Sequence, residues 1–354
     1  MARLLVLLLL LAMLGKSLSF SPPLQLQAEW IQLKDAPLIT PKRSGHVSIH
    51  TKDGRILVFG GYVEVGDRRY VTNDLWEWKH QGWALVDQSG QELPGPRLVS
   101  AAGLVGETPY MLGGWDPQNE GTGGVMLDTV HKLDLNKNEW TLLEDVTLPG
   151  GPTSRHVCLS LSNGKLLFHN HRCTDHVYLF DGQAFTKQST TGDAPSSRGL
   201  HSATMLSETH ALFFAGAAQD GNMSNECFVL NTETYKWTHL QVEGDTQPSP
   251  RASPCLCQYT SHCAIVFGGA SKGAAGLLPE GDVWALHLDS NYQKGAWKLL
   301  SSQGPPPRNA ATLNFISSKD NGTKEYLLQG GWAPFVETHS DCFKLQITET
   351  NRDA

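Results

Sequence analysis

Six arginines recur along the chain at similar spacing, and an acidic residue follows each of them further along the same segment. A guanidinium group can bind a carboxylate, sulfate or phosphate through two parallel hydrogen bonds, and it can equally form an ion pair with a carboxylate of its own protein. The two alternatives are therefore recognition of an anionic group and a repeated structural ion pair. The arginines are Arg43, Arg97, Arg155, Arg198, Arg251 and Arg308, and the acids are Asp74, Asp128, Asp175, Glu226, Asp282 and Asp341.

Three aromatic residues begin polar segments, namely Tyr62, Trp115 and Trp332. Aromatic rings that begin exposed loops can bind a sugar, an aromatic group or a peptide, and they can also pack beneath the loop. The segments 62–72, 115–127 and 270–281 are the longest and the richest in glycine. We expect specificity for a partner to lie in these three segments.

A third group with possible chemistry consists of His169, His171 and Cys173. Alternate residues of a β-strand point to the same face, so a strand here would bring two imidazoles and a thiol together. Such a set could bind zinc or copper. An exposed strand face, or a disulfide at Cys173, would account for the same residues. We therefore favour no metal and predict no cofactor.

All these residues belong to one repeat, in which an arginine is followed by an apolar run, a glycine pair, an acid and an aromatic. A period of roughly 40 to 60 residues fits a four-stranded propeller blade. The near-continuous apolar second run of each unit predicts a strand that is covered on both faces. The glycine pairs are Gly60-Gly61, Gly113-Gly114, Gly268-Gly269 and Gly330-Gly331, with Gly216-Ala217 and His169-Asn170 in the degenerate positions; the aromatics are Trp83, Trp140, Phe185, Trp237 and Trp297.

The sixth unit has no aromatic residue at the expected position after Asp341. Near the start of the chain, Trp30 precedes Arg43 by a spacing similar to that between the other aromatics and their next arginines. We therefore expect the segment around Glu29 to Leu33 to pair with the C-terminal unit. That pairing would close a ring and remove two open sheet edges.

The pattern resembles the kelch-repeat β-propeller family over residues 28 to 347. The motifs that carry the resemblance are Val58-Phe59-Gly60-Gly61, Met111-Leu112-Gly113-Gly114, Val266-Phe267-Gly268-Gly269 and Leu328-Gln329-Gly330-Gly331. The predicted fold is all-β, a six-bladed β-propeller of kelch repeats whose ring is closed by an N-terminal strand that completes the C-terminal blade. The expected boundaries are 28–34 for the closing strand and 41–86, 95–143, 153–188, 196–240, 249–300 and 306–347 for the blades, within a single domain of residues 20–354.

The resemblance implies that the six arginines look into or across a central channel, and that the partner is a protein, which can be acidic. We expect the six arginines, together with Tyr62, Trp115 and Trp332, to form a binding surface for an extracellular or lumenal protein or glycan. The alternative is a secreted enzyme, similar to a mutarotase or an oxidase, whose channel arginines position an acidic group of a sugar or small anion. No complete catalytic constellation is present, so a binding module is the favoured interpretation.

The first residues predict a signal peptide at 1–19, with Arg3, an apolar stretch from Leu4 to Leu14, and a cleavage site after Ser19. We therefore expect a secreted protein or one in the secretory lumen. Asn222 and Asn321 begin Asn-x-Ser/Thr triplets and are predicted glycosylation sites. The net charge of −7, without a basic run, argues against nucleic acid as a partner. The predicted signal peptide is too short to be a membrane anchor, and no other stretch approaches a membrane span.

Seven cysteines are too few for a scaffold that depends on disulfides, and their odd number leaves at least one thiol without an intramolecular partner. Cys255, Cys257 and Cys263 are the best candidates for a local disulfide, followed by Cys158 and Cys173. The sequence leaves the pairing open.

Overall fold

The computed structural model describes residues 24–34, 40–80, 82–118, 123–274, 276–334 and 336–350. The predicted signal peptide lies outside the described residues. All regular elements in the described part are β-strands, and they form six larger sheets and two small ones. No helix that could span a membrane occurs in this part of the chain.

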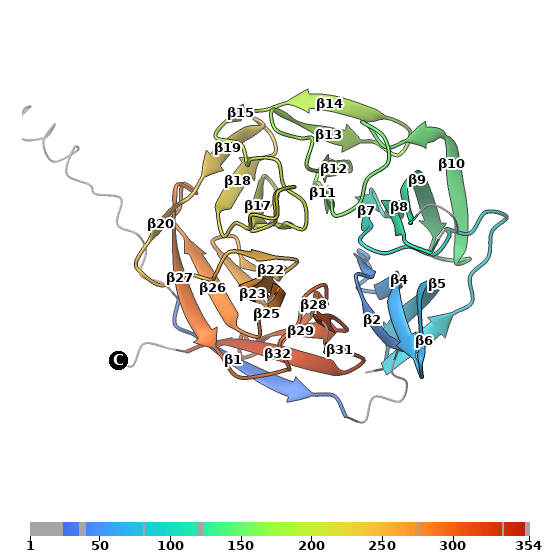
Figure 1. Cartoon of the computed structure of the whole chain (residues 1–354). Coiled ribbons are helices and arrows are strands. Elements are labelled where there is room, and N and C mark those ends of the chain that lie inside the picture. The colour runs from blue at the N-terminus through green and yellow to red at the C-terminus, as the bar shows by residue number, and fades with distance from the viewer. Residues whose placement is uncertain are drawn as a thin grey trace, which may run out of the picture.

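The six larger sheets follow one another around a common centre (Figure 1). Sheet 1 contains β2 (Lys42–Ser44), β3 (Val47–His50), β4 (Ile56–Val65), β5 (Arg68–Lys79) and β6 (Gly82–Val86). Sheet 2 contains β7 (Ala101–Val105), β8 (Thr108–Asp116), β9 (Val125–Asp134) and β10 (Glu139–Thr147). Sheet 3 contains β11 (Val157–Ser160), β12 (Leu166–His169), β13 (His176–Phe180) and β14 (Phe185–Ser189).

The second half of the chain continues the same antiparallel pattern, with one short parallel edge strand added to each of sheets 4 and 5. Sheet 4 contains β15 (Thr191–Gly192), β16 (Ser202–Met205), β17 (His210–Phe214), β18 (Cys227–Asn231) and β19 (Lys236–His239). Sheet 5 contains β20 (Gln241–Glu243), β22 (Cys255–Thr260), β23 (Cys263–Phe267), β26 (Val283–Leu288) and β27 (Lys294–Ser301). Sheet 6 contains β28 (Thr312–Ser318), β29 (Lys324–Gln329), β32 (Cys342–Glu349) and β1 (Leu26–Gln32).

Two small sheets lie beyond sheets 5 and 6 and extend their hairpins. The first contains β21 (Arg251–Ala252), β24 (Ala270–Gly273) and β25 (Gly276–Pro279), and the second contains β30 (Trp332–Ala333) and β31 (Glu337–Thr338). The segments 62–72 and 270–281, expected to be loops, therefore consist largely of hairpin strands. The segment 115–127 is strand only in its first and last residues. Strand pairing satisfies their backbone polar groups and extends these hairpins beyond the sheets.

Strand β1 pairs antiparallel with the last strand, β32, and Trp30 lies opposite Leu345. The Trp30 ring packs edge-on against Phe267 of sheet 5, with ring centroids 4.9 Å apart. The aromatic position of sheet 6 is therefore filled from the N-terminal end of the described chain.

The core consists of apolar clusters between neighbouring sheets. The second strands are the most buried elements; β12 and β23, for example, are buried at every residue. One cluster joins Val58 and Trp83 of sheet 1 to Leu327 of sheet 6, and similar clusters join each other pair of consecutive sheets. Each second strand is thus covered on both faces, as the apolar runs predict.

A cycle of backbone hydrogen bonds connects the starts of the innermost strands. Each sheet contributes one residue with positive φ, and its N–H donates to the carbonyl of the corresponding residue in a neighbouring sheet, over distances of 2.7 to 3.3 Å. In order of donation the cycle runs Gly45, Ala310, Ser253, Leu200, Arg155, Val99 and back to Gly45.

We predict that Gly268→Ala destabilises the protein by more than about 3 kcal/mol. A Cβ atom at this position would lie 2.5 Å from the Arg308 carbonyl oxygen, and the residue has a φ of +65°. Gly221→Ala is the matched control, because Gly221 has a φ of +82° with no atom within 4 Å of a Cβ. We expect the control to lose about 1 kcal/mol. Chemical denaturation measures both losses, and equal losses would contradict the steric argument.

Candidate functional site

Five of the six repeat arginines are buried and bind groups of their own sheet. In each, a terminal guanidinium nitrogen donates to the carbonyl of the first residue of the glycine pair, or of the residue in its place, at distances of 2.8 to 3.3 Å. The pairs are Arg43 with Gly60, Arg97 with Gly113, Arg198 with Ala215, Arg251 with Gly268 and Arg308 with Gly330.

Four of these arginines also form ion pairs with the predicted acids. The bonds join Arg43 to Asp74, Arg198 to Glu226, Arg251 to Asp282 and Arg308 to Asp341, with shortest distances of 2.5 to 2.8 Å. Burial by itself would raise the pKa of Asp282, but the hydrogen bond and charge of Arg251 hold it below the usual value. The structural ion pair is therefore the role that the geometry supports at these four positions.

Arg97 follows the same pattern without a carboxylate bond. Its second contact is the Thr129 hydroxyl, 3.1 Å away. Burial lowers the pKa of its guanidinium to about 10, which still leaves it charged at neutral pH.

Arg155 does not occupy the repeat position that its spacing suggests. The Thr153 carbonyl accepts a hydrogen bond from the Gly114 N–H, just as the Arg97 carbonyl accepts one from the Gly61 N–H. The Thr153 side chain is also buried, as those of the five arginines are. Arg155 lies two residues later, with a φ of +60°, in the backbone cycle. The expected equivalence was wrong because the spacing between units varies by more than two residues.

In sheet 4, the residues that take the place of the glycine pair lie one position earlier than expected. Ala215 and Gly216, with φ of 66° and 103°, take the places of a glycine pair, and Gly216 donates to the Arg251 carbonyl. The pair is thus Ala215-Gly216, and Ala217 belongs to the following hairpin.

A cavity at the centre, beside the backbone cycle, is small and does not receive the five buried arginines. It has a volume of about 180 Å³ and is lined by residues of the backbone cycle together with His46, His156 and His201. Among the six arginines, Arg155 alone is part of its described lining. The other five are turned into the sheets, because the carbonyls and carboxylates that they bind lie there.

Antiparallel strands alternate in direction, so the connections from second to third strands all lie at one end of the sheets. We call this end the loop-bearing face. A cavity of about 470 Å³ on this face brings Tyr62 and Trp332 together with Leu98 and Val336. Val336 is 75% exposed, so this cavity, which we call the Trp332 cavity, offers apolar surface to solvent.

A second cavity on the same face, the Arg155 cavity, has a volume of about 520 Å³. Arg155, His171 and Arg172 lie in its wall, and its described lining contains no carboxylate. The Arg155 guanidinium lies 5.6 Å from the centre of the Trp115 ring. Because no carboxylate of the described lining neutralises these two exposed guanidinium groups, this cavity suits an anionic group.

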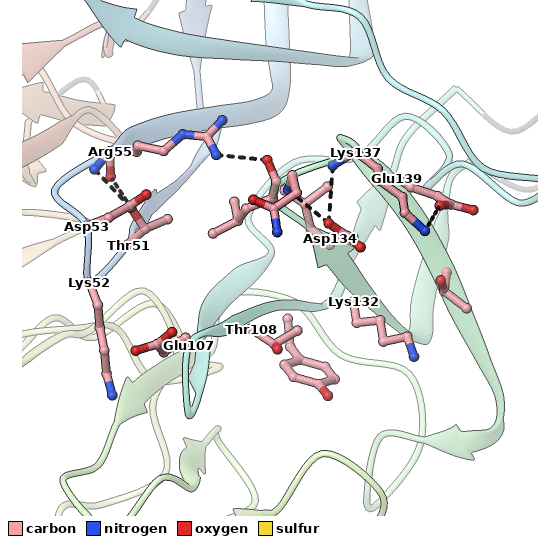
Figure 2. Close-up of a pocket in the computed structure, with 15 residues that line it drawn as sticks. Thr51, Lys52, Asp53, Arg55, Glu107, Thr108, Lys132, Asp134, Lys137 and Glu139 are labelled. Carbon is pink, nitrogen blue, oxygen red and sulfur yellow. Dashed lines mark hydrogen bonds and ion pairs between the residues drawn. The ribbon is translucent and has the colours of Figure 1, made fainter.

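The cavity at the opposite end of the sheets has a different electrostatic character (Figure 2). It lies between sheets 1 and 2, has a volume of about 850 Å³, and is bridged by a 3.0 Å hydrogen bond from Arg55 to the Leu135 carbonyl. Its lining contains equal numbers of cationic and anionic side chains. The cations are Lys52, Arg55, Lys132 and Lys137, and the anions are Asp53, Glu107, Asp134 and Glu139. Such a lining has no excess charge with which to select an ion.

The predicted His and Cys set does not share a strand face. Strand β12 ends at His169, and the Cys173 N–H donates to the Asn170 carbonyl in a turn. His169 is buried and forms a 3.0 Å hydrogen bond with His201. No group of three His, Cys, Asp or Glu side chains in the described part of the chain is arranged to hold a metal.

The cysteines of the described residues are all free thiols, so none of the candidate disulfides is present. Burial raises the pKa of Cys173 to about 11 and that of Cys255 to about 12. These thiols therefore remain protonated and behave as core residues.

Several residues of the two cavities had no signal in the repeat. Leu98 and Arg172 follow no motif, and Val336 stands in a segment that the sequence analysis did not mark. The excess of cationic side chains around Arg172 depends on the packing of sheet 3 beside sheet 4, so the repeat pattern did not predict it.

A model of the KLHDC2/KLHL20/DRC7 Kelch-repeats domain matches residues 164–351, which is more than half of the chain. The chain belongs to the kelch-repeat family. It is a kelch-repeat β-propeller, and kelch repeats are typical of protein-binding modules.

Three curated relatives show the same similarity. Acyl-CoA-binding domain-containing protein 4 of Arabidopsis thaliana is 25% identical over 73% of this chain and 38% of its own length. Host cell factor 1 of Homo sapiens is 26% identical over 82% of this chain and 15% of its own. Kelch domain-containing protein 10 of Homo sapiens is 24% identical over 65% of this chain and 52% of its own. The kelch chain thus spans less than two thirds of each relative.

Two arginine substitutions should separate the structural positions from the exposed one. We expect Arg251→Ala to cost about 3 to 5 kcal/mol, because it leaves Asp282 and the Gly268 carbonyl without their partner. Arg155→Ala should change stability by less than about 0.5 kcal/mol, because its side chain is exposed. Denaturation curves of both variants check this, and a larger loss for Arg155→Ala would place it in the structural set.

Stability should fall as the pH decreases from 6.5 towards 4. Burial, with the nearby charges of Arg43 and Arg198, lowers the pKa of His46 and His169 to about 3. The unfolded chain then binds protons that the folded chain does not, so the stabilisation is present above pH 6.5 and is lost below it. Each histidine should cost about 2 kcal/mol between pH 7 and pH 5.

Denaturation at several pH values measures this slope. His46→Gln, which can keep the hydrogen bond to Thr312, should reduce the slope by one histidine's share. His80→Gln, at an exposed position, should leave it unchanged. An unchanged slope in the His46 variant would contradict the assignment.

Proposed function

We propose that this chain is a secreted, six-bladed kelch propeller that binds an acidic protein partner through its loop-bearing face. The observation that carries the binding proposal is the Arg155 cavity, in which two exposed arginines and a histidine meet no acidic side chain of the described lining. An acidic group of a partner would supply the missing carboxylate.

The proposed blade count and ring closure are supported by three features. The backbone cycle passes through six sheets and returns to its start. An apolar cluster joins sheet 6 to sheet 1, and β1 pairs with β32. Secretion is supported by the apolar stretch after Arg3 and by the small residues that precede Phe20.

The Trp332 cavity gives the second part of the proposed site. Tyr62, Leu98 and Trp332 line it, and the Leu98 backbone pairs with the Trp115 backbone through two 2.9 Å hydrogen bonds. Trp115 in turn contacts Arg155. The Trp332 cavity, whose lining also contains Glu64, Arg69 and Glu337, is therefore connected to the cationic cavity through adjacent residues. One partner segment with an apolar and an acidic side chain would fit both.

The channel enzyme considered from the sequence has less support. It requires arginines that face a substrate, and five of the six bind groups of their own sheets. Binding of a glycan in place of a protein stays an outcome of the test below.

The test is selection of displayed random peptides on the purified protein. We expect enriched sequences to combine Asp or Glu with an aromatic or aliphatic residue. The double variant Arg155→Ala, Arg172→Ala should bind a selected peptide at least about tenfold more weakly, because charge-assisted hydrogen bonds contribute about 1.5 to 3 kcal/mol each. Affinity should also fall with added salt.

The matched control is Lys187→Ala with Lys236→Ala, which removes two exposed cations from β14 and β19. It should bind like the wild type. Equal weakening by both double variants would reduce the effect to net charge and contradict the site. Selected peptides without acidic residues would also contradict the site. Binding to a glycan array without selection of any peptide would show that the partner is a glycan and not a protein.

A further inference from the structure

The two predicted glycosylation sites lie at opposite ends of the sheets. Asn222 is exposed in the connection between β17 and β18, which belongs to the loop-bearing face. Asn321 is exposed in the turn between β28 and β29, a connection from first to second strand, which belongs to the other end. The chain thus carries its own matched control for a modification at Asn222.

The Asn222 connection is continuous with the wall of the Arg155 cavity. The Ala218 N–H donates to the Asn222 carbonyl over 2.8 Å, and Ala217 pairs with Met223. Ala217 and Ala218 line the cavity together with Arg155 and Arg172. Asn222 therefore stands on the segment that borders the cationic cavity.

In the folded connection, the third residue of the acceptor triplet is held by hydrogen bonds. In the folded protein the Ser224 hydroxyl donates to Glu226 and accepts a hydrogen bond from Arg198. Transfer during synthesis would join the Asn222 amide nitrogen to the first sugar of a lipid-linked oligosaccharide. The bond between that sugar and the lipid pyrophosphate breaks, and the amide loses one proton.

The folded structure can accommodate the product. Asn222 Nδ2 donates to Asp220 Oδ2 over 2.7 Å, and the substituted amide retains one N–H for this bond. The exposed side chain leaves the added sugars in solvent.

We propose that an N-linked glycan at Asn222 covers the Arg155 cavity and regulates the access of anionic partners to it. The inference rests on the secretion and binding site proposed above. A bulky, hydrated glycan that borders the cavity would shield its two exposed arginines, whereas a glycan at Asn321 would leave them open.

The test uses the full chain, expressed in secretory cells and purified from the medium. Phenylglyoxal, an arginine-specific reagent, is the probe, and peptide mass spectrometry measures its rate at each site. Arg155 and Arg172 should react several-fold more slowly in the glycosylated protein than after trimming with an endoglycosidase that leaves one sugar. Arg68, exposed on sheet 1, should react equally in both.

Two variants assign the effect. Asn222→Gln should react rapidly at Arg155 before and after trimming, whereas Asn321→Gln should keep the protection. Equal rates with Asn222 glycosylated would overturn the inference and leave the proposed function standing. A glycan at Asn321 alone would also overturn it. Failure of the chain to reach the medium would overturn secretion, and the inference with it.

Discussion

The buried hydrogen bond from an arginine to the carbonyl of the first residue of the glycine pair, or of the residue in its place, is the interaction on which the repeat depends. At this point the backbone has positive φ, and the next sheet's backbone lies against it; the Gly61 N–H, for example, donates to the Arg97 carbonyl. The carbonyl of the first residue of the pair is buried and needs a hydrogen-bond donor, which the guanidinium supplies. Arg97 shows that this bond persists without an ion pair. The carboxylate is thus the secondary partner.

Arginine and glycine therefore form one unit, and sheet 3 lacks both of its parts. Thr153 stands where an arginine is expected, and His169-Asn170 stands where glycines are expected. In the described part of the chain the Arg198 carbonyl receives no backbone hydrogen bond from sheet 3, although the corresponding carbonyl receives one at each of the other junctions. A hydrogen bond between His169 and His201 joins sheets 3 and 4 instead.

This departure also explains the position of the Arg155 cavity. Sheet 3 has a short turn between β12 and β13, where sheets 1 and 2 have long hairpins. The space above the turn is bordered by Arg155, Arg172 and the first residues of the sheet 4 connection. The loss of one structural arginine and the gain of an exposed one two positions later thus occur in the same sheet. The architecture is repetitive, and the candidate site lies where the repetition fails.

The sequence by itself determined the fold class, the positions of most strands, and the partner of β1. These follow from local patterns, since apolar runs, glycine pairs and the spacing of Trp30 depend on residues close in the chain. It also offered a structural ion pair as one of two roles for the six arginines, and the structure shows that role at Arg43, Arg198, Arg251 and Arg308.

Only the tertiary structure decided which arginines are exposed. Arg155 matches the repeat by spacing, and the hydrogen bond that Thr153 accepts from Gly114 shows that it lies outside the structural set. The turn after His169, which separates His171 and Cys173 from it, was likewise invisible in the alternation of residue types. Cavities form between sheets, from residues distant in the chain, so their charge depends on contacts that no local pattern contains.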